Sequence, residues 1–231
     1  MSSEPLILAV ETATLSGSLA LTRGAEVIGG FNGDPAVSHS NTLLADLDKL
    51  LSESKVTLVT VDLFAVAAGP GSFTGLRIGI ATVKALAATL DRPCAAVPTL
   101  HAVALSGGAS EASVALLPAG RGEVFAQLFS VSTDGVVKAL DEPSHISPKK
   151  MIDKYGSLES VVWCGSGAIA QRELIASSDE GKEWRIPPQT DNLAEHVAAL
   201  ALRNFNEDRL VAPEELHAIY VRPSDAELKV S

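Results

Sequence analysis

The sequence contains few of the residues that mark several common classes of protein. It has two cysteines in 231 residues, and aromatic residues make up only 4% of it. Lysine and arginine form no cluster, and the formal net charge is −10. Because affinity for nucleic acid depends largely on neutralised phosphates, we expect weak binding of free RNA or DNA. Cys94 and Cys164 lie in apolar surroundings, which favours buried reduced thiols over a disulfide.

Signals for membrane insertion, metal binding and hydrolysis are also missing. No apolar run approaches the length of a bilayer, and residues 1–5 lack a basic start with an apolar core, so we expect a cytoplasmic protein without membrane association. None of the five histidines has another three or four residues away, so we expect no metal. The serine in Gly71–Gly75 stands one residue too early for a Gly-x-Ser-x-Gly elbow, which leaves a hydrolytic triad unsupported.

The residues that are abundant indicate an α/β protein. Hydrophobic residues make up 46% of the chain, mostly Ala, Val and Leu, which is ample for a buried core in one large domain or two small ones. Residues 1–105 predict the order βββαβαβ, and residues 106–231 predict a smaller α/β lobe whose last segment packs back on the first lobe. The predicted strands of the first part are 6–11, 18–22, 26–31, 63–68 and 94–97.

The most informative segment is Gly69-Pro70-Gly71-Ser72-Phe73-Thr74-Gly75-Leu76-Arg77-Ile78-Gly79. It predicts a tight turn between a buried strand and a helix of about residues 75–90, with Ser72 or Thr74 as the cap. Backbone N–H groups beside a helix N-terminus suit an anion or a nucleotide. The candidate contacts are Glu11, Thr12, Gly71, Ser72 and Gly75. The alternative is a turn that needs glycine for its dihedral angles and for close packing of strand and helix.

Two helices of the first part have apolar surfaces. Leucines at positions 43, 44, 47, 50 and 51 predict an amphipathic helix after His39. The next helix has no polar face beyond Arg77, Thr82, Lys84 and Thr89, so it should be covered on more than one side. Ala81, Ala85 and Ala88 form a stripe of small residues that another helix could approach closely. The sequence does not decide whether this helix is buried within its own domain or contacts a partner.

The second half repeats the pattern more loosely. Strands are predicted at 113–117, 123–130, 135–139 and 161–164, and helices at 147–155, at 168–176 and from the Thr190-Asp191 cap through Leu202. Gly165-Ser166-Gly167 follows a strand, as do many ligand-binding loops at the carboxyl edge of an α/β sheet.

Several segments together resemble the TsaB (YeaZ) family. They are Glu11-Thr12-Ala13-Thr14, His39-Ser40 before Leu43-Leu44, the segment Gly69–Gly79 with the Ala-Thr-Val-Lys-Ala-Leu-Ala that follows it, Val97-Pro98-Thr99-Leu100, Arg121-Gly122-Glu123-Val124-Phe125 and Tyr220-Val221-Arg222-Pro223. The resemblance therefore covers nearly the whole chain and is most specific in the glycine segment.

This resemblance implies a two-lobed actin-like α/β fold, of the sugar kinase and Hsp70 kind. It implies a role in making threonylcarbamoyladenosine at position 37 of tRNA, as a non-catalytic subunit that needs no cofactor. The expected partners are a TsaD-like catalytic subunit in a heterodimer, a TsaE-like ATPase, a second copy when the chain is alone, and tRNA only through the complex.

Single positions agree with a non-catalytic role. The related catalytic subunit has Asn-His-x-Glu-Gly-His after the equivalent short strand, whereas Thr99 and Val103 stand at the two histidine positions here, and His101 lies between them. One imidazole cannot rebuild that metal site. Glu11 replaces the usual Asp, and Pro118-Ala119-Gly120-Arg121 replaces Asp-Ala-Arg-Arg, so we carry no ligand contact over to these positions.

In the family, subunits meet through two helices of the first lobe, here 39–54 and 74–90. The resemblance thus places the interface at His39, Leu43, Leu47, Arg77, Ile78, Gly79, Thr82 and Ala85. The competing hypothesis is a small ATP-binding phosphotransferase or ATPase of the same fold, motivated by the two glycine turns. A peptidase would need a metal or a nucleophile that the sequence does not show.

Overall fold

A computed structural model describes residues 4–34, 36, 39–179 and 181–221, with residues 39–41 described by their backbone only. The chain forms two compact units. The first comprises residues 1–102 and 191–219, and the second comprises residues 103–190 and 220–231. The first unit thus ends at residue 102, and the segment 191–219 returns to it.

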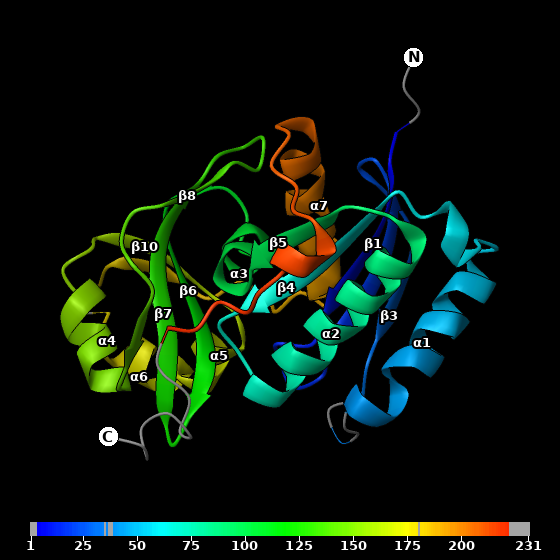
Figure 1. The fold of residues 1–231 in the computed structure, drawn as a ribbon. Coiled ribbons are helices and arrows are strands. Elements are labelled where there is room, and N and C mark those ends of the chain that lie inside the picture. The colour runs from blue at the N-terminus through cyan, green and yellow to red at the C-terminus, as the bar shows by residue number, and fades with distance from the viewer. Residues whose placement is uncertain (1–3, 35, 37–38, 180, 222–231) are drawn as a thin grey trace. The chain divides into compact units, whose positions relative to one another are not determined.

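The first unit is built on a five-stranded sheet in the order β3-β2-β1-β4-β5 (Figure 1). Its strands are β1 (Leu6–Glu11), β2 (Ser18–Arg23), β3 (Glu26–Asn32), β4 (Leu63–Gly69) and β5 (Cys94–Pro98). β1 pairs with β2 antiparallel and with β4 parallel. All residues of β1 and β4 are buried, as expected for central strands that are covered on both faces. The predicted βββαβαβ order is confirmed for this part.

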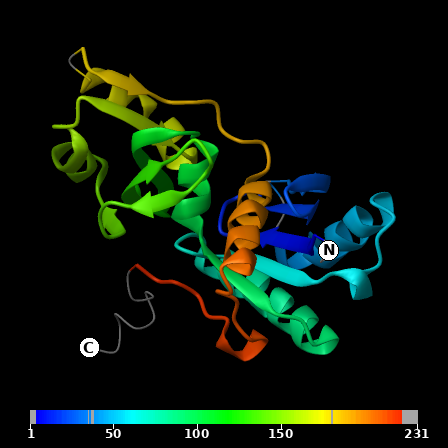
Figure 2. The same ribbon diagram turned by 90° about the horizontal axis from the view of Figure 1, so that it is seen from above.

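Helices cover both faces of this sheet. They are α1 (His39–Glu53), α2 (Phe73–Leu90) and α7 (Leu193–Asn206), with short 3₁₀ turns η1 (Leu58–Thr60) and η2 (Pro213–Glu215). A Cβ on Gly29 would lie 2.9 Å from Leu50 of α1, whereas one on Gly30 would lie 3.1 Å from Asn192 before α7. Since neighbouring residues of a strand point to opposite faces, α1 and α7 cover opposite sides. Figure 2 shows α7 and α2 on either side of the strands.

The second unit has a six-stranded sheet in the order β11-β10-β6-β7-β8, with β9 also paired to β7. Its elements are α3 (Thr99–Ser106), which begins in the first unit, β6 (Ser110–Gly120), β7 (Glu123–Val131), β8 (Val137–Ala139), β9 (Ser144–Ile146), α4 (Pro148–Tyr155), β10 (Ser160–Cys164), α5 (Ser166–Ala170), α6 (Arg172–Ser177) and β11 (Glu183–Arg185). Trp163 is fully buried and meets Trp184 edge to face at 5.1 Å.

Helix α7 explains why the end of the chain returns to the first unit. It buries Leu193, Ala194, Val197, Ala198 and Ala201, and it packs on β1 and β2. Its cap is Asn192, whose side chain accepts a hydrogen bond from the N–H of Glu195, so the predicted Thr190-Asp191 cap is wrong. The Asn192 amide also donates to the carbonyl of Leu19 over 3.0 Å, which fixes the helix to β2.

The sequence analysis expected no apolar run of bilayer length, and this expectation is wrong for one helix. α2 has 18 residues and is long and apolar enough to cross a membrane by length and composition. The core helix of a soluble protein passes the same test. α2 packs on β4 and buries Leu76, Ile80 and Val83, so its composition reflects helix-to-sheet packing on that side.

Candidate functional site: the glycine turn and helices α1 and α2

The glycine segment brings the start of α2 directly onto the turn after β1. A Cβ on Gly75 would lie 1.9 Å from the carbonyl oxygen of Thr12, and one on Gly71 would lie 2.5 Å from that of Ala13. A Cβ on Gly79 would lie 2.2 Å from the Thr12 hydroxyl. No side chain fits at these separations. Close packing against backbone atoms therefore requires glycine at positions 71 and 75, and packing against a side chain favours it at position 79, which agrees with one of the two alternatives left open by the sequence.

Protein groups occupy two of the backbone N–H groups that could have met an anion. The N–H of Ser72 donates to the carbonyl of Ala13 over 2.8 Å, and the N–H of Gly75 donates to the Ser72 hydroxyl over 3.2 Å. Ser72 is thus the cap of α2, as predicted. Because these donors are used inside the fold, the N-terminus of α2 has less capacity to bind an anion.

Glu11 ends β1 and is 1% exposed. One of its carboxylate oxygens accepts from the backbone N–H of Thr14 over 2.7 Å. The other accepts from the Thr14 hydroxyl over 2.8 Å and from the Ser18 hydroxyl over 3.3 Å. The carboxylate therefore holds the β1–β2 turn in shape. These contacts support a structural role for Glu11.

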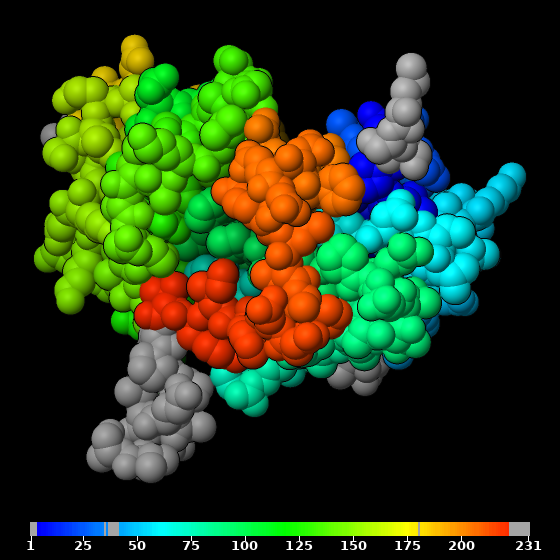
Figure 3. Space-filling model, turned by 45° about the horizontal axis from the view of Figure 1, so that its top comes forward, coloured from blue at the N-terminus to red at the C-terminus, as the bar shows by residue number. Residues whose placement is uncertain are grey.

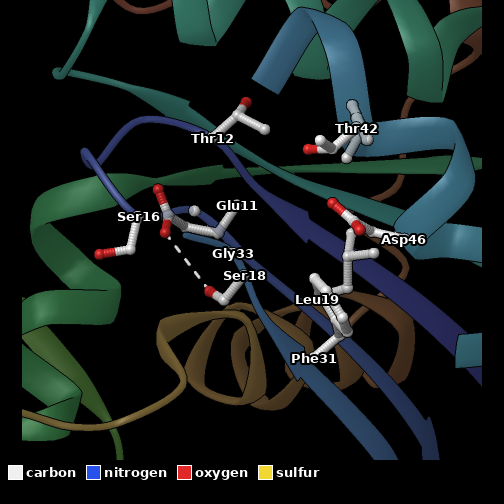
Figure 4. A pocket seen from close by; sticks show the side chains of 11 residues that line it. Glu11, Thr12, Ser16, Ser18, Leu19, Phe31, Gly33, Thr42 and Asp46 are labelled. Atoms are coloured by element: carbon white, nitrogen blue, oxygen red, sulfur yellow. Dashed lines mark hydrogen bonds between the residues drawn. The ribbon is translucent and has the colours of Figure 1, made fainter. Parts of the chain in front are cut away.

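A small cavity lies beside Glu11, between the β1–β2 turn and α1 (Figure 4). Its volume is about 20 Å³, which suffices for one water molecule and excludes a nucleotide. The carboxylates of Glu11 and Asp46 lie on different sides of it, and that of Glu11 turns toward Ser16 and Ser18. Among the described residues, no group of three or more His, Cys, Asp or Glu side chains could hold a metal ion.

The chain itself covers the carboxyl end of β4, where ligands bind in many α/β sheets. The N–H of Ile219 donates to the carbonyl of Ala68 over 2.7 Å. A Cβ on Gly69 would lie 2.3 Å from the carbonyl oxygen of Ile219, and Gly69 has a φ of +121°. On the other side, the N–H of Gly69 donates to the hydroxyl of buried Thr99 over 3.0 Å. Within the first unit, this strand end is therefore closed.

Helix α3 has no histidine at either of the two positions that carry one in the Asn-His-x-Glu-Gly-His motif of the related catalytic subunit. Thr99 accepts the hydrogen bond from Gly69, and Val103 is 2% exposed. Burial lowers the pKa of His101, which favours its neutral form. The residues present do not fit the two-histidine metal site.

The glycine loop of the second unit also serves packing. Gly165 has a φ of +92°, and a Cβ there would lie 2.4 Å from the carbonyl oxygen of Leu116. A Cβ on Gly167 would lie 2.8 Å from the carbonyl carbon of the same residue. This loop holds the short α5 against β6. Its glycines need no ligand to explain them.

The outward side of α2 is open and built from small residues. Ala81, Ala85 and Ala88 are exposed, and they form the stripe recognised in the sequence. Figure 3 shows this surface of α2 uncovered between α1 and the segment that follows α7. At the start of the helix, the Arg77 guanidinium stacks over the exposed ring of Phe73 at 3.9 Å. The sequence had left open whether α2 is buried within its own domain. For the alanine stripe that alternative is wrong, because the three alanines are exposed.

The structure divides the predicted interface residues into two groups. Arg77 and Ala85 are exposed, and Ile78 and Thr82 are half-buried on α2. Leu43, Leu47 and Gly79 are buried in the first unit and offer little surface of their own, and their place in the interface stays a prediction. The side chains of His39 and Ser40 lie outside the described residues, as do Arg222 and Pro223. Leu44, which the sequence placed in the leucine stripe of α1, is 65% exposed, whereas the other four leucines of that stripe are buried.

Comparisons with known proteins agree with this architecture. The family model described as "TsaD: tRNA N6-adenosine threonylcarbamoyltransferase" matches residues 28–201. The "tRNA threonylcarbamoyladenosine biosynthesis protein TsaB" of Haemophilus influenzae is 33% identical over 229 residues, covering 94% of this chain and 93% of the relative. The chain belongs to the TsaB family. The Escherichia coli TsaB protein of the same description is 29% identical and covers 94% of each chain.

A solved TsaB-family structure confirms the fold. "YeaZ from Pseudomonas aeruginosa" superposes with a TM-score of 0.77 at 24% identity, and the match covers 94% of this chain and 99% of that one. The chain thus has the mixed α/β fold of YeaZ, as the resemblance to the TsaB (YeaZ) family implied.

Proposed function

We propose that this chain is the non-catalytic subunit of a tRNA threonylcarbamoyladenosine complex, and that it supports a TsaD-like catalytic subunit by binding it through the outer sides of α1 and α2. Its TsaB relatives are named for the biosynthesis of this modified nucleoside. The open alanine stripe of α2 is the observation that carries the proposal.

The chemistry of this surface suits a helix of another subunit. Alanines at positions 81, 85 and 88 recur at the i, i+4, i+7 spacing of one helix face, and their short side chains let two helix axes approach closely. Exposed Leu44 on α1 and exposed Phe73 on α2 add larger apolar side chains, with the Arg77 guanidinium stacked on the Phe73 ring. Aromatic residues and arginine are enriched in protein interfaces.

The non-catalytic part of the proposal is supported by features of the first unit. The cavity beside Glu11 has room for a water molecule, and the carboxyl end of β4 is covered by Ile219. Thr99 and Val103 supply neither imidazole of a two-histidine metal site. The same features count against the alternative of an ATP-binding phosphotransferase, because both glycine turns are explained by packing.

The remaining partners follow from this role. We propose that a TsaE-like ATPase joins the heterodimer, that two copies pair through the same helices when the catalytic subunit is absent, and that tRNA is met only through the complex. A net charge of −10 fits indirect contact with tRNA. Such a role places the chain in the cytoplasm.

Mixing the purified chain with the TsaD subunit of its own organism on a sizing column tests the proposal. The native chain should elute with its partner, whereas Ala85→Glu should elute separately, because a carboxylate would be buried without a partner in the interface. Ala176→Glu is the matched control, since Ala176 is an exposed helical alanine in the second unit. Equal thermal midpoints would show that both variants fold. Co-elution of Ala85→Glu at native strength would contradict the proposed interface.

A further inference from the structure

A pocket that the proposed function does not use lies between the β2–β3 hairpin and α7. Its volume is about 340 Å³, within the range of small-molecule sites. The residues that line it are Thr22, Gly24, Ala25, Val27, Glu195, Ala199, Leu202, Arg203 and Asn206. Those from α7 recur along one face of the helix. α7 and α1 cover opposite sides of the sheet, so this pocket lies away from the interface proposed above.

One wall of the pocket contains a polar group that the fold leaves unused. Thr22 is 3% exposed, and its hydroxyl has no hydrogen-bond partner among the described residues. Leaving a buried hydroxyl unpaired costs free energy, and valine would fill the same space without that cost. The hydroxyl oxygen itself is buried, so a ligand group in the pocket would reach it after rotation of the Thr22 side chain about its Cα–Cβ bond, and the hydrogen bond would then remove the cost.

The polar side chains are ordered along the pocket. Ala194 N–H bonds to the Ser18 hydroxyl, so the start of α7 lies at the start of β2, and both elements run toward the hairpin turn. Glu195 is therefore at the inner end of the pocket, and Thr22 follows further along. Arg203 and Asn206 lie at the outer end, near Gly24. Ala199, Leu202 and Val27 supply apolar surface between the ends.

This order selects a ligand with a positive and a negative end. Glu195 and Arg203 are eight residues apart, which is about 12 Å along the helix axis. Single amino acids have their two charges too close together to reach both residues. An extended peptide advances about 3.4 Å per residue, so two or three residues span most of this distance. Its amide groups would pass the Thr22 hydroxyl.

We propose that this pocket binds a short free peptide, with its ammonium group at Glu195, its backbone at Thr22 and its carboxylate at the Arg203 end. The proposal concerns the first unit alone, so it stands or falls independently of the catalytic partner.

Titration of the isotope-labelled chain with trialanine, followed by amide chemical shifts, tests the pocket. We expect saturable shifts at the hairpin and at the outer half of α7. Alanine and N-acetyl-trialanine amide should bind at least about tenfold more weakly, since each lacks the length or the charged ends. No saturable shift with trialanine, or equal binding of either control ligand, would overturn the proposal.

Two variants test the assigned groups. Thr22→Val removes the hydroxyl at nearly constant shape, and Glu195→Gln removes the negative charge. Each should weaken trialanine binding by about tenfold, the usual effect of losing one good hydrogen bond. Thr57→Val, at an exposed position before η1, is the matched control and should bind as the native chain does. Native affinity in both pocket variants would contradict the assignment, and thermal midpoints equal to that of the native chain check that they fold.

Discussion

The hydroxyl of Thr12 donates a hydrogen bond to the carbonyl oxygen of Gly75 over 2.7 Å, which ties the turn after β1 to the first turn of α2. The carbonyl oxygen of Thr12 lies 1.9 Å from the place that a Cβ on Gly75 would take. The two backbones therefore meet at a separation that only glycine permits. This contact fixes where α2 lies on the sheet, and so where its alanine stripe points.

Gly75→Ala should strongly destabilise the first unit, because the new methyl group would overlap a backbone oxygen that cannot move alone. We expect the free energy of unfolding to fall by about 3 kcal/mol, as for other overpacked sites. Urea unfolding followed by circular dichroism measures this loss. An unchanged urea midpoint would show that α2 does not depend on this contact.

Gly79→Ala provides a matched comparison, since its methyl group would meet the side-chain hydroxyl of Thr12 and not the backbone. Adding Thr12→Ala should restore part of the stability lost in Gly79→Ala. The same second change should restore nothing in Gly75→Ala. Equal rescue of both would contradict the assigned contacts.

Local patterns in the sequence predicted the order of elements in the first unit but missed short ones. Short apolar runs, the alternation in residues 18–31, the leucine stripe and the glycine turn identified β1 to β5, α1 and α2. α3 was missed because Thr99–Ser106 is short and apolar almost throughout, so it shows no helical face. β9 and β11 have three residues each, too few for a pattern.

The sequence predicted only those features of the candidate site that depend on residues close together along the chain. The glycine segment indicated close approach of backbones, but the atoms that approach come from Thr12, Ala13 and Ile219, far away in sequence. The leucine stripe of α1 showed an apolar face, and the structure buries that face in its own core. Leu44 was counted in this stripe, but it lies at its edge and is 65% exposed, so the spacing alone did not separate the core face from the outer surface.

Both thiols should resist alkylation in the folded chain. Burial raises the pKa of Cys94 to about 11 and that of Cys164 to about 12. At about pH 8 almost no reactive thiolate is present, and access is also blocked. We expect very slow labelling by iodoacetamide in buffer and full labelling of both thiols in concentrated urea. Rapid labelling of the native chain would show that these positions are open.

Tyr155 should make the second unit sensitive to alkali. Burial raises the pKa of this phenol to about 12, and its hydroxyl donates to Asp141 over 2.9 Å. A pKa raised on folding stabilises the folded state fully below pH 10 and loses that contribution as the pH rises through 12. Tyr155→Phe should cost about 1 kcal/mol at neutral pH and flatten the alkaline fall in stability. The exposed Tyr220→Phe is the control, and identical pH profiles for both variants would contradict the assignment.

Lys84 should hold the segment after α7 against α2. Its ammonium group donates to the carbonyl of Glu214 over 2.9 Å and to that of Leu216 over 3.4 Å. Lys84→Met keeps most of the aliphatic stem but removes both hydrogen bonds, so we expect a loss of about 1 kcal/mol. The effect should be local: amide hydrogen exchange at Ile219, whose N–H bonds to Ala68, should accelerate more than exchange in β1.

The matched control for this change is Lys150→Met, because Lys150 is exposed on α4 in the second unit. Faster exchange at Ile219 in Lys84→Met alone would show that the lysine fastens the segment that covers the end of β4. If Ile219 exchanged at the native rate in Lys84→Met, the Cys94–Val211 backbone pair would be the sufficient anchor, because it joins this segment to β5 through two hydrogen bonds of 2.9 Å.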